Sequence, residues 1–214
     1  MEGGPGGVTP GGAASRDPAM HALLVGLAVA LFVLQPLADL GRLPAWLPPF
    51  VTLLTLAAGV VALQDRALGW PAAALALLLG VAMAADDPAT AGVAGGAGLL
   101  VIALALLRRV LAPGEVTRQR LEGAVALYLV IALAFASAYE ALAAVEPAAF
   151  AGAAGLPQSF RYFSLVVQTS TGFGDIAPAT PVARTLVTAQ AVLGQLYIAI
   201  ILARLVSLGI GGRR

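Results

Sequence analysis

The chain contains no cysteine, and only 11% of its 214 residues are charged. Without cysteine it has no disulfide framework and no thiol chemistry. A soluble domain carries about 25% charged residues, so the low charge content excludes an ordinary soluble fold. Lysine is also absent, and the net charge is +1. No basic cluster forms an exposed face, so we predict no nucleic-acid partner.

Motifs of enzyme active sites are absent as well. The sequence has no metal-ligand cluster, no Ser/His/Asp set and no phosphate-binding loop after a strand. We therefore predict that the protein is not an enzyme and needs no cofactor. All 12 basic residues are arginine, and alanine and glycine are abundant. That composition is typical of a GC-rich bacterial genome.

Apolar sequence is what the chain has in abundance. Hydrophobic residues make up 60% of it, and the mean hydropathy is +0.93. A helix that crosses the hydrocarbon core needs about 20 apolar residues. Six runs of this kind occur, at 20–38, 47–64, 67–85, 91–111, 122–145 and 182–208. We predict an all-α, multi-pass integral membrane protein with six transmembrane helices.

The arginines predict the orientation. If the N-terminus is cytoplasmic, the outer segments hold only three arginines, at 42, 161 and 184. The inner segments then hold nine, at 16, 66, 108, 109, 118, 120, 204, 213 and 214. This distribution obeys the positive-inside rule. We predict a plasma (inner) membrane protein with both termini in the cytoplasm.

Between the last two runs lies Thr169-Ser170-Thr171-Gly172-Phe173-Gly174-Asp175. An ion that sheds its water in a pore is surrounded instead by rings of backbone carbonyls. Successive carbonyls can point one way only if alternate residues adopt conformations that glycine adopts at little cost. The Ser170 hydroxyl would add a last ring below, and Phe173 would brace the stretch from behind. A plain glycine turn between two helices is the alternative.

This stretch resembles the selectivity filter of the potassium channel superfamily, and the chain is similar to its six-transmembrane bacterial members. The usual filter reads Thr-Val-Gly-Tyr-Gly-Asp. The resemblance implies that K⁺, the permeant ion, binds at Ser170, Thr171, Gly172 and Phe173, and that Gly174 completes the filter. One chain supplies one filter segment and has no internal repeat, so four copies would form a homotetramer.

Three positions depart from the usual filter, and they keep alternatives open. Ser170 keeps the hydroxyl of Thr, and Phe173 replaces Tyr. Thr171 replaces Val and places a second hydroxyl behind the filter. The main prediction is a potassium-selective channel. A weakly selective channel for monovalent cations and a non-conducting membrane scaffold or auxiliary subunit are the alternatives.

The resemblance also implies supporting residues. Asp175 corresponds to an acid just outside the filter, and Tyr162 stands where its aromatic partner would be. Glu140 is similar to the acid that ends the fifth helix and braces the outer filter mouth; a solvated helix end is the alternative. Gly194 lies 20 residues after Gly174, at the position of a gating hinge. Close packing against the pore helix would explain this glycine equally well.

The domain organisation follows from these features. We expect a disordered cytoplasmic tail at 1–19, a four-helix peripheral domain at 20–112, a linker at 113–121, a pore domain at 122–209 and a short tail at 210–214. The linker is predicted to be a helix on the inner membrane surface.

The pore domain is expected to contain an outer helix, a flexible turret at 146–156, a re-entrant pore helix at 157–169, the filter and an inner helix. Thr180 is a good cap and Pro181 a good first residue for that inner helix.

The four front helices lack the charges of a voltage sensor. A sensor needs several Arg or Lys residues spaced through its fourth helix, whereas Arg108 and Arg109 come only at the inner end. We predict that steep voltage gating is absent and that glycines let these helices pack closely. Arg108 and Arg109 either contact lipid headgroups or the linker, or serve as ordinary positive-inside anchors.

Overall fold

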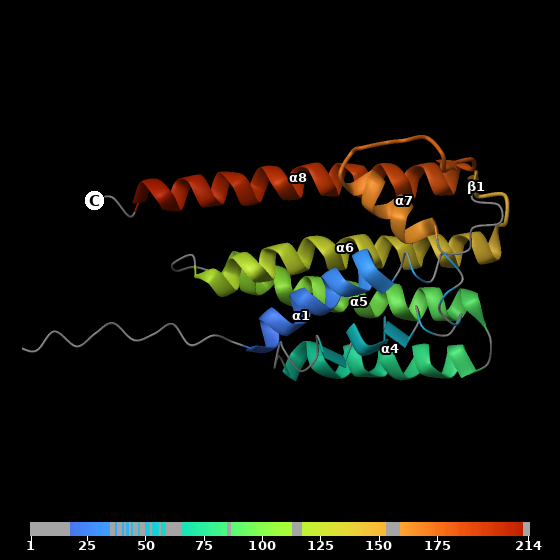
Figure 1. Ribbon diagram of the computed structural model, residues 1–214, viewed down its shortest axis with the longest axis horizontal. Coiled ribbons are helices and arrows are strands. Elements are labelled where there is room, and N and C mark those ends of the chain that lie inside the picture. The colour runs from blue at the N-terminus through green and yellow to red at the C-terminus, as the bar shows by residue number, and fades with distance from the viewer. Residues whose placement is uncertain are drawn as a thin grey trace, which may run out of the picture.

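The computed structural model describes residues 18–34, isolated positions between 37 and 58, and residues 66–84, 87–112, 117–152 and 159–211 (Figure 1). The predicted tails at 1–19 and 210–214 lie largely outside this part of the chain, and so does most of the predicted span at 47–64.

Helices make up most of the described structure. They are α1 (Pro18–Val29) with a π-helical continuation η1 (Ala30–Leu34), α4 (Arg66–Ala84), α5 (Pro88–Leu111), α6 (Arg118–Val145), α7 (Ser159–Gln168) and α8 (Pro181–Gly211). Two short strands, β1 (Phe150–Ala151) and β2 (Ala177–Pro178), form an antiparallel ribbon.

Three described helices are long and apolar enough to cross a membrane: Ala89–Leu111, Arg118–Val145 and Pro181–Ile201. Met20–Leu34 is a shorter apolar helix. The helix α4 has 19 residues, about the length of one crossing. The prediction of an all-α membrane protein is confirmed, while the number of six crossings stays a prediction.

The helices α4, α5 and α6 lie side by side, and α8 lies at the edge of the bundle next to α6 and α7 (Figure 1). The start of α1, the end of α5, the start of α6 and the end of α8 share one end of the molecule. The arginines that we placed on the inner side between 108 and 120, and at 204, therefore gather at that end.

Small residues let α5 and α6 approach closely. A Cβ added to Gly92 would lie 2.9 Å from both the Ala141 Cβ and the Ser137 carbonyl oxygen. One turn later, a Cβ on Gly96 would lie 3.3 Å from the Ala134 carbonyl oxygen. The distances at Gly92 are too short for a side chain and the one at Gly96 is tight, so the two glycines let the helices lie at this spacing.

The start of α5 is fixed by a local cap. The carboxylate of Asp87 accepts hydrogen bonds from the Thr90 hydroxyl at 2.5 Å and from the Ala89 backbone N–H at 3.1 Å. The hydrogen bonds from Thr90 hold the pKa of Asp87 below its ordinary value. This arrangement is a regular N-cap.

The expected surface helix at 113–121 is not formed by its described part. Thr117 caps α6 by accepting the Arg120 backbone N–H at 3.4 Å, and the helix runs without a break from Arg118. Arg118 and Glu122 form an ion pair at 3.0 Å on the first turns of α6 itself. Residues 113–116 lie outside the described structure.

The expected flexible turret at 146–156 is ordered over its first half. Phe150 and Ala151 pair with Pro178 and Ala177, and the Ala179 backbone N–H donates to the Ala149 carbonyl at 2.8 Å. Small side chains indicated flexibility, but buried Phe150 anchors the segment. Residues 153–158 lie outside the described part.

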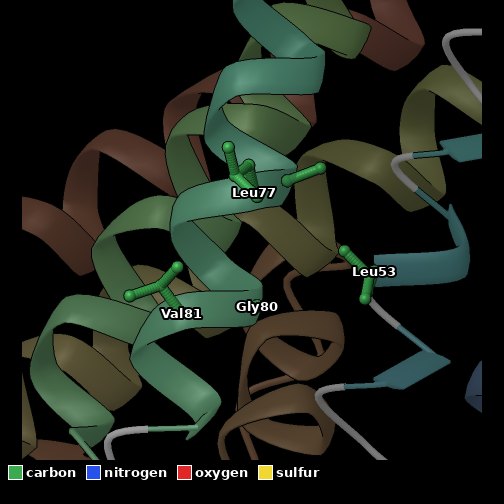
Figure 2. Close-up of a pocket in the computed structure, with 5 residues that line it drawn as sticks. Leu53, Leu77, Gly80 and Val81 are labelled. Atoms are coloured by element: carbon green, nitrogen blue, oxygen red, sulfur yellow. The ribbon is translucent and has the colours of Figure 1, made fainter.

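A cavity of about 500 Å³ opens on α4, lined by Leu53, Ala76, Leu77, Gly80 and Val81 (Figure 2). All five residues are apolar, and Leu77 and Val81 are exposed. Such a surface has no group that would orient a polar ligand. It fits contact with lipid tails.

Candidate functional site

The helix α7 positions the candidate site. It lies between α6 and α8, and it begins near the ribbon, at the end of the molecule opposite the arginine-rich end (Figure 1). Phe160 and Phe163 join Tyr139 of α6 and Phe150 of β1 in a buried aromatic cluster, with ring centroids 4.9 to 6.4 Å apart. Each such pair contributes about 0.5–1.5 kcal/mol beyond its buried area, so the start of α7 is held firmly.

The end of α7 passes through a Schellman turn directly into residues 170–174, which we call the motif. The Thr171 backbone N–H donates to the Val166 carbonyl at 2.9 Å, and the Ser170 N–H donates to the Val167 carbonyl at 3.0 Å. This turn places Ser170 at the left-handed position usually occupied by glycine, with φ of 56°. A non-glycine residue in that conformation costs about 1–3 kcal/mol.

Positive φ angles alternate along the motif. Ser170 has φ of 56°, Gly172 61° and Gly174 80°. No other non-glycine residue among those described has a positive φ. The alternation is the backbone pattern that a column of aligned carbonyls requires. All five residues from 170 to 174 are exposed in the single chain.

The hydroxyls of residues 169–171 all form hydrogen bonds. The Ser170 Oγ accepts a hydrogen bond from the Gln195 Nε2 of α8 at 2.6 Å. The hydroxyls of Thr169 and Thr171 are 2.8 Å apart, and that of Thr169 donates to the Leu165 carbonyl at 2.8 Å. Thr171 is therefore the donor to Thr169, because each hydroxyl has one proton.

The structure brings Tyr162 and Asp175 together, as the resemblance implied. The Tyr162 hydroxyl donates a hydrogen bond to the Asp175 carboxylate. The ring of Tyr162 also stacks on Phe173, with centroids 6.3 Å apart and an angle of 6° between the planes. Phe173 thus packs against α7 near the Gly174 end of the motif.

Glu140 faces α7. Its Oε1 lies 4.0 Å from the Nε of Arg161 on the first turns of α7, and the Glu140 side chain is 33% exposed. This acid therefore supports the helix that precedes the motif.

Gly194 packs against the end of α7. A Cβ added there would collide with the Gln168 carbonyl oxygen and lie 3.1 Å from the Gln168 Cγ. The helix α8 continues through this position from Pro181 to Gly211. This contact supports close packing as the reason for glycine here, and the gating hinge stays a prediction.

A buried polar network lies behind the motif. Ser164, Gln168 and Gln190 are completely buried. The Gln190 Nε2 donates to the Ser164 Oγ at 2.6 Å and to the Gln168 Oε1 at 3.1 Å, and its Oε1 accepts from the Tyr139 hydroxyl at 2.5 Å. The Ser164 hydroxyl donates to the Ala132 carbonyl at 2.6 Å. Side chains of three helices are therefore bonded to one another.

The same network reaches the last residue of α7. The Gln168 Nε2 donates to the Tyr128 carbonyl at 2.6 Å, and the Tyr128 hydroxyl donates back to the Gln168 carbonyl at 3.1 Å. Gln168 is therefore hydrogen-bonded to α6 through both its side chain and its backbone. Gln190 was not predicted from the sequence, although an amide side chain within the apolar helix α8 is itself a signal.

The turret reaches the residue that follows the motif. Gly152 has φ of 82°, and a Cβ there would collide with the Asp175 carbonyl oxygen. The Thr180 hydroxyl, which caps α8 by accepting the Ala183 N–H at 3.4 Å, also donates to the Glu146 carboxylate at 3.1 Å. Thr180 and Pro181 begin α8 as predicted, and Gly152 was missed because nothing in the sequence pairs it with Asp175.

A family model described as "ion channel" matches residues 125–210. The match covers α6, α7, the motif and α8, which is less than half of the chain. It supports an ion-channel function for a membrane protein. No curated protein and no solved structure matches the chain.

Proposed function

We propose that the chain forms a homotetrameric potassium-selective channel whose ion path is lined by Ser170, Thr171, Gly172, Phe173 and Gly174. The observation that carries the proposal is the alternation of positive φ at 170, 172 and 174, directly after a short helix. Glycine would be less strained in this conformation than Ser170 is. The presence of serine therefore argues that its hydroxyl takes part in the ion path.

Conduction would be passive. K⁺ would exchange its water for backbone carbonyls as it enters the path, and repulsion between successive ions would let it leave. The carboxylate of Asp175 stands beside the outer end and attracts cations. The C-terminal, partially negative end of α7 favours a cation on the axis below.

The exposed surface of α8 supports a tetramer. Only 11% of the apolar, membrane-spanning stretch of α8 is buried, compared with 61% of the corresponding stretch of α6. Val192, Leu196 and Ile200 recur four residues apart and are each more than half exposed. Non-helical backbone at membrane depth is stable only where protein covers it or it lines a wet cavity. Four copies around residues 170–175 meet that requirement.

Gating of this channel would depend only weakly on voltage. The helix α5 carries no charge before Arg108, and each charge moved through the field is worth about 2.3 kcal/mol per 100 mV. We expect a nearly flat open probability between about −120 and about +120 mV. An effective gating charge of several units would contradict this.

The decisive test of conduction is K⁺ flux into liposomes that contain the purified full-length protein. We expect flux that barium blocks, and loss of flux in Gly172→Ala, because alanine is strained at φ of 61°. Gly26→Ala is the control, since a Cβ at Gly26 meets nothing within 4 Å. Absence of flux in a folded tetramer would favour the non-conducting scaffold.

A weakly selective cation channel is the second candidate, and the Thr171 hydroxyl favours it. Its bond to Thr169 at 2.8 Å places a polar group where the usual filter has a valine. If the Thr171 hydroxyl lowers the selectivity of the ion path, Thr171→Val should increase the preference for K⁺ over Na⁺. Equal preference in both proteins would remove the argument for this candidate.

A further inference from the structure

A second cavity lies at the arginine-rich end of the molecule. Its volume is about 430 Å³, and it opens where α1, the end of α5 and the start of α6 meet. Its lining combines two kinds of residue: the apolar Met20, Leu106, Val110, Ala112 and Gly123, and the polar Arg109, Thr117, Gln119 and Arg120.

The polar lining suits a phosphate group. A guanidinium presents its N–H donors in a planar fork that matches two oxygens of a phosphate. Arg109 and Arg120 come from different helices, so they can approach one phosphate from two directions. The Arg120 Nη1 donates to the Ala112 carbonyl at 2.9 Å, which fixes its guanidinium in the wall of the cavity.

The neighbouring acid does not oppose an anion there. Glu122 is one position from Gly123, but it is not among the described lining residues. Its carboxylate is bound to the Arg118 Nε at 3.0 Å and is approached by the His21 Nδ1 at 3.4 Å. The cavity therefore has a positive wall beside an apolar floor.

We propose that this cavity binds an anionic phospholipid of the inner leaflet, with its phosphate at Arg109 and Arg120 and its glycerol and upper acyl carbons over Met20, Leu106 and Val110. Basic pockets between transmembrane helices on the cytoplasmic side suit anionic headgroups. A free phosphate would leave the apolar floor exposed to water. Binding at this site does not depend on the proposed conduction.

The site also has a route to α8. The Ala112 carbonyl accepts hydrogen bonds from the Arg120 Nη1 at 2.9 Å and from the Arg204 Nη2 of α8 at 2.7 Å. A phosphate that accepts hydrogen bonds from the other N–H groups of Arg120 changes how Arg120 and Arg204 share that carbonyl. Arg204 is then the contact through which lipid occupancy affects the inner end of α8.

The first test counts lipid bound to the purified full-length protein by native mass spectrometry. The probes are dioleoylphosphatidylglycerol and dioleoylphosphatidylcholine. We expect a preference of roughly tenfold or more for the anionic lipid, and its loss in Arg109→Gln/Arg120→Gln. Arg108→Gln is the matched control, because Arg108 is exposed on the same turn and does not line the cavity.

Three results would overturn the proposal: equal binding of the two lipids, an equal loss of preference in Arg108→Gln, or displacement of the lipid by millimolar inorganic phosphate. The second result would mean general surface attraction. The third would mean that the site takes a free anion.

A second pair of variants fills the cavity without changing charge. A Cβ at Gly123 would lie 3.6 Å from the Val110 Cγ2 and 3.8 Å from the Met20 Sδ, which is ordinary contact. Gly123→Ala should therefore bind lipid as the native protein does, whereas Gly123→Leu should lose the preference. Native-like lipid binding by a folded Gly123→Leu tetramer would contradict the assignment.

K⁺ flux in vesicles with and without phosphatidylglycerol tests the coupling to α8, and this readout rests on the proposed function. Arg204→Gln should remove the dependence of flux on the anionic lipid while lipid binding persists. An unchanged dependence would exclude Arg204 as the route. Lipid binding without any flux would contradict the channel proposal and leave the lipid site standing.

Discussion

Two parts of the molecule are held together by different forces. We call α1, α4 and α5 with the adjoining face of α6 the front part, and α6, α7 and α8 around residues 170–174 the pore part. In the front part, α1 and α5 pack on α6, and α4 packs on α5, through apolar side chains and closely spaced glycines. In the pore part, buried Ser164, Gln168 and Gln190 bond α6, α7 and α8 to one another. The two parts share α6, which presents an apolar face to one and polar partners to the other.

The difference explains what each part can control. Apolar packing is non-directional and tolerates volume-conserving changes. Hydrogen bonds fix angles as well as distances, and a path lined by carbonyls depends on angles. We therefore expect substitutions in the front part to change stability, and substitutions in the pore part to change permeation.

Gln190→Leu should break the pore part most severely. Leucine has a similar size but leaves the Tyr139 hydroxyl and the Gln168 Oε1 without their partner at 2.5 and 3.1 Å. Each buried group left unpaired costs about 1–3 kcal/mol. We expect loss of K⁺ flux and a large fall in the melting temperature of the tetramer in detergent. Flux at the native level would show that the network does not support the ion path.

Gly194→Ala should have the next largest effect. The added methyl group would meet the Gln168 carbonyl, which is backbone and cannot rotate away. We expect flux to fall by about tenfold or more, since overpacking costs about 1–3 kcal/mol.

Gly80→Ala is the matched change in the front part, because nothing lies within 4 Å of its added Cβ. It should leave flux unchanged. If Gly194→Ala altered only the kinetics of opening, the hinge interpretation would replace close packing.

The sequence predicted the arrangement around the motif better than the forces that hold it. Apolar run lengths located α5, α6 and α8, and Thr180 and Pro181 located the start of α8, because these signals are local. The partners of Gln190 lie 22 to 51 residues away along the chain, and the partner of Gly152 lies 23 residues away. Only the folded backbone determines such contacts, so the network and the turret contact could not be predicted.

Tyr162→Phe should have an intermediate effect. It keeps the stacking on Phe173 and removes the hydroxyl that donates to Asp175. A hydrogen bond of this kind contributes about 1 kcal/mol, or about a fivefold change between filter conformations. We expect single-channel recordings to show a similarly reduced open fraction with unchanged K⁺ over Na⁺ preference. An open fraction equal to that of the native channel would mean that stacking alone holds Phe173.

Leu79→Ala should have the smallest effect on permeation. Leu79 of α4 is 2% exposed in the front core, and removing its side chain costs about 2–5 kcal/mol. We expect a lower melting temperature with native K⁺ selectivity in the protein that stays folded. A change in selectivity would mean that the two parts are not separate in function.

The most direct test of the account is the reversal potential of the purified channel with K⁺ on one side of the bilayer and Na⁺ on the other. The polar network and the alternating backbone of residues 170–174 predict a potential strongly displaced in the direction that K⁺ selectivity requires. A reversal potential near zero would contradict the account, because a path lined by fixed carbonyls would then not distinguish the two ions.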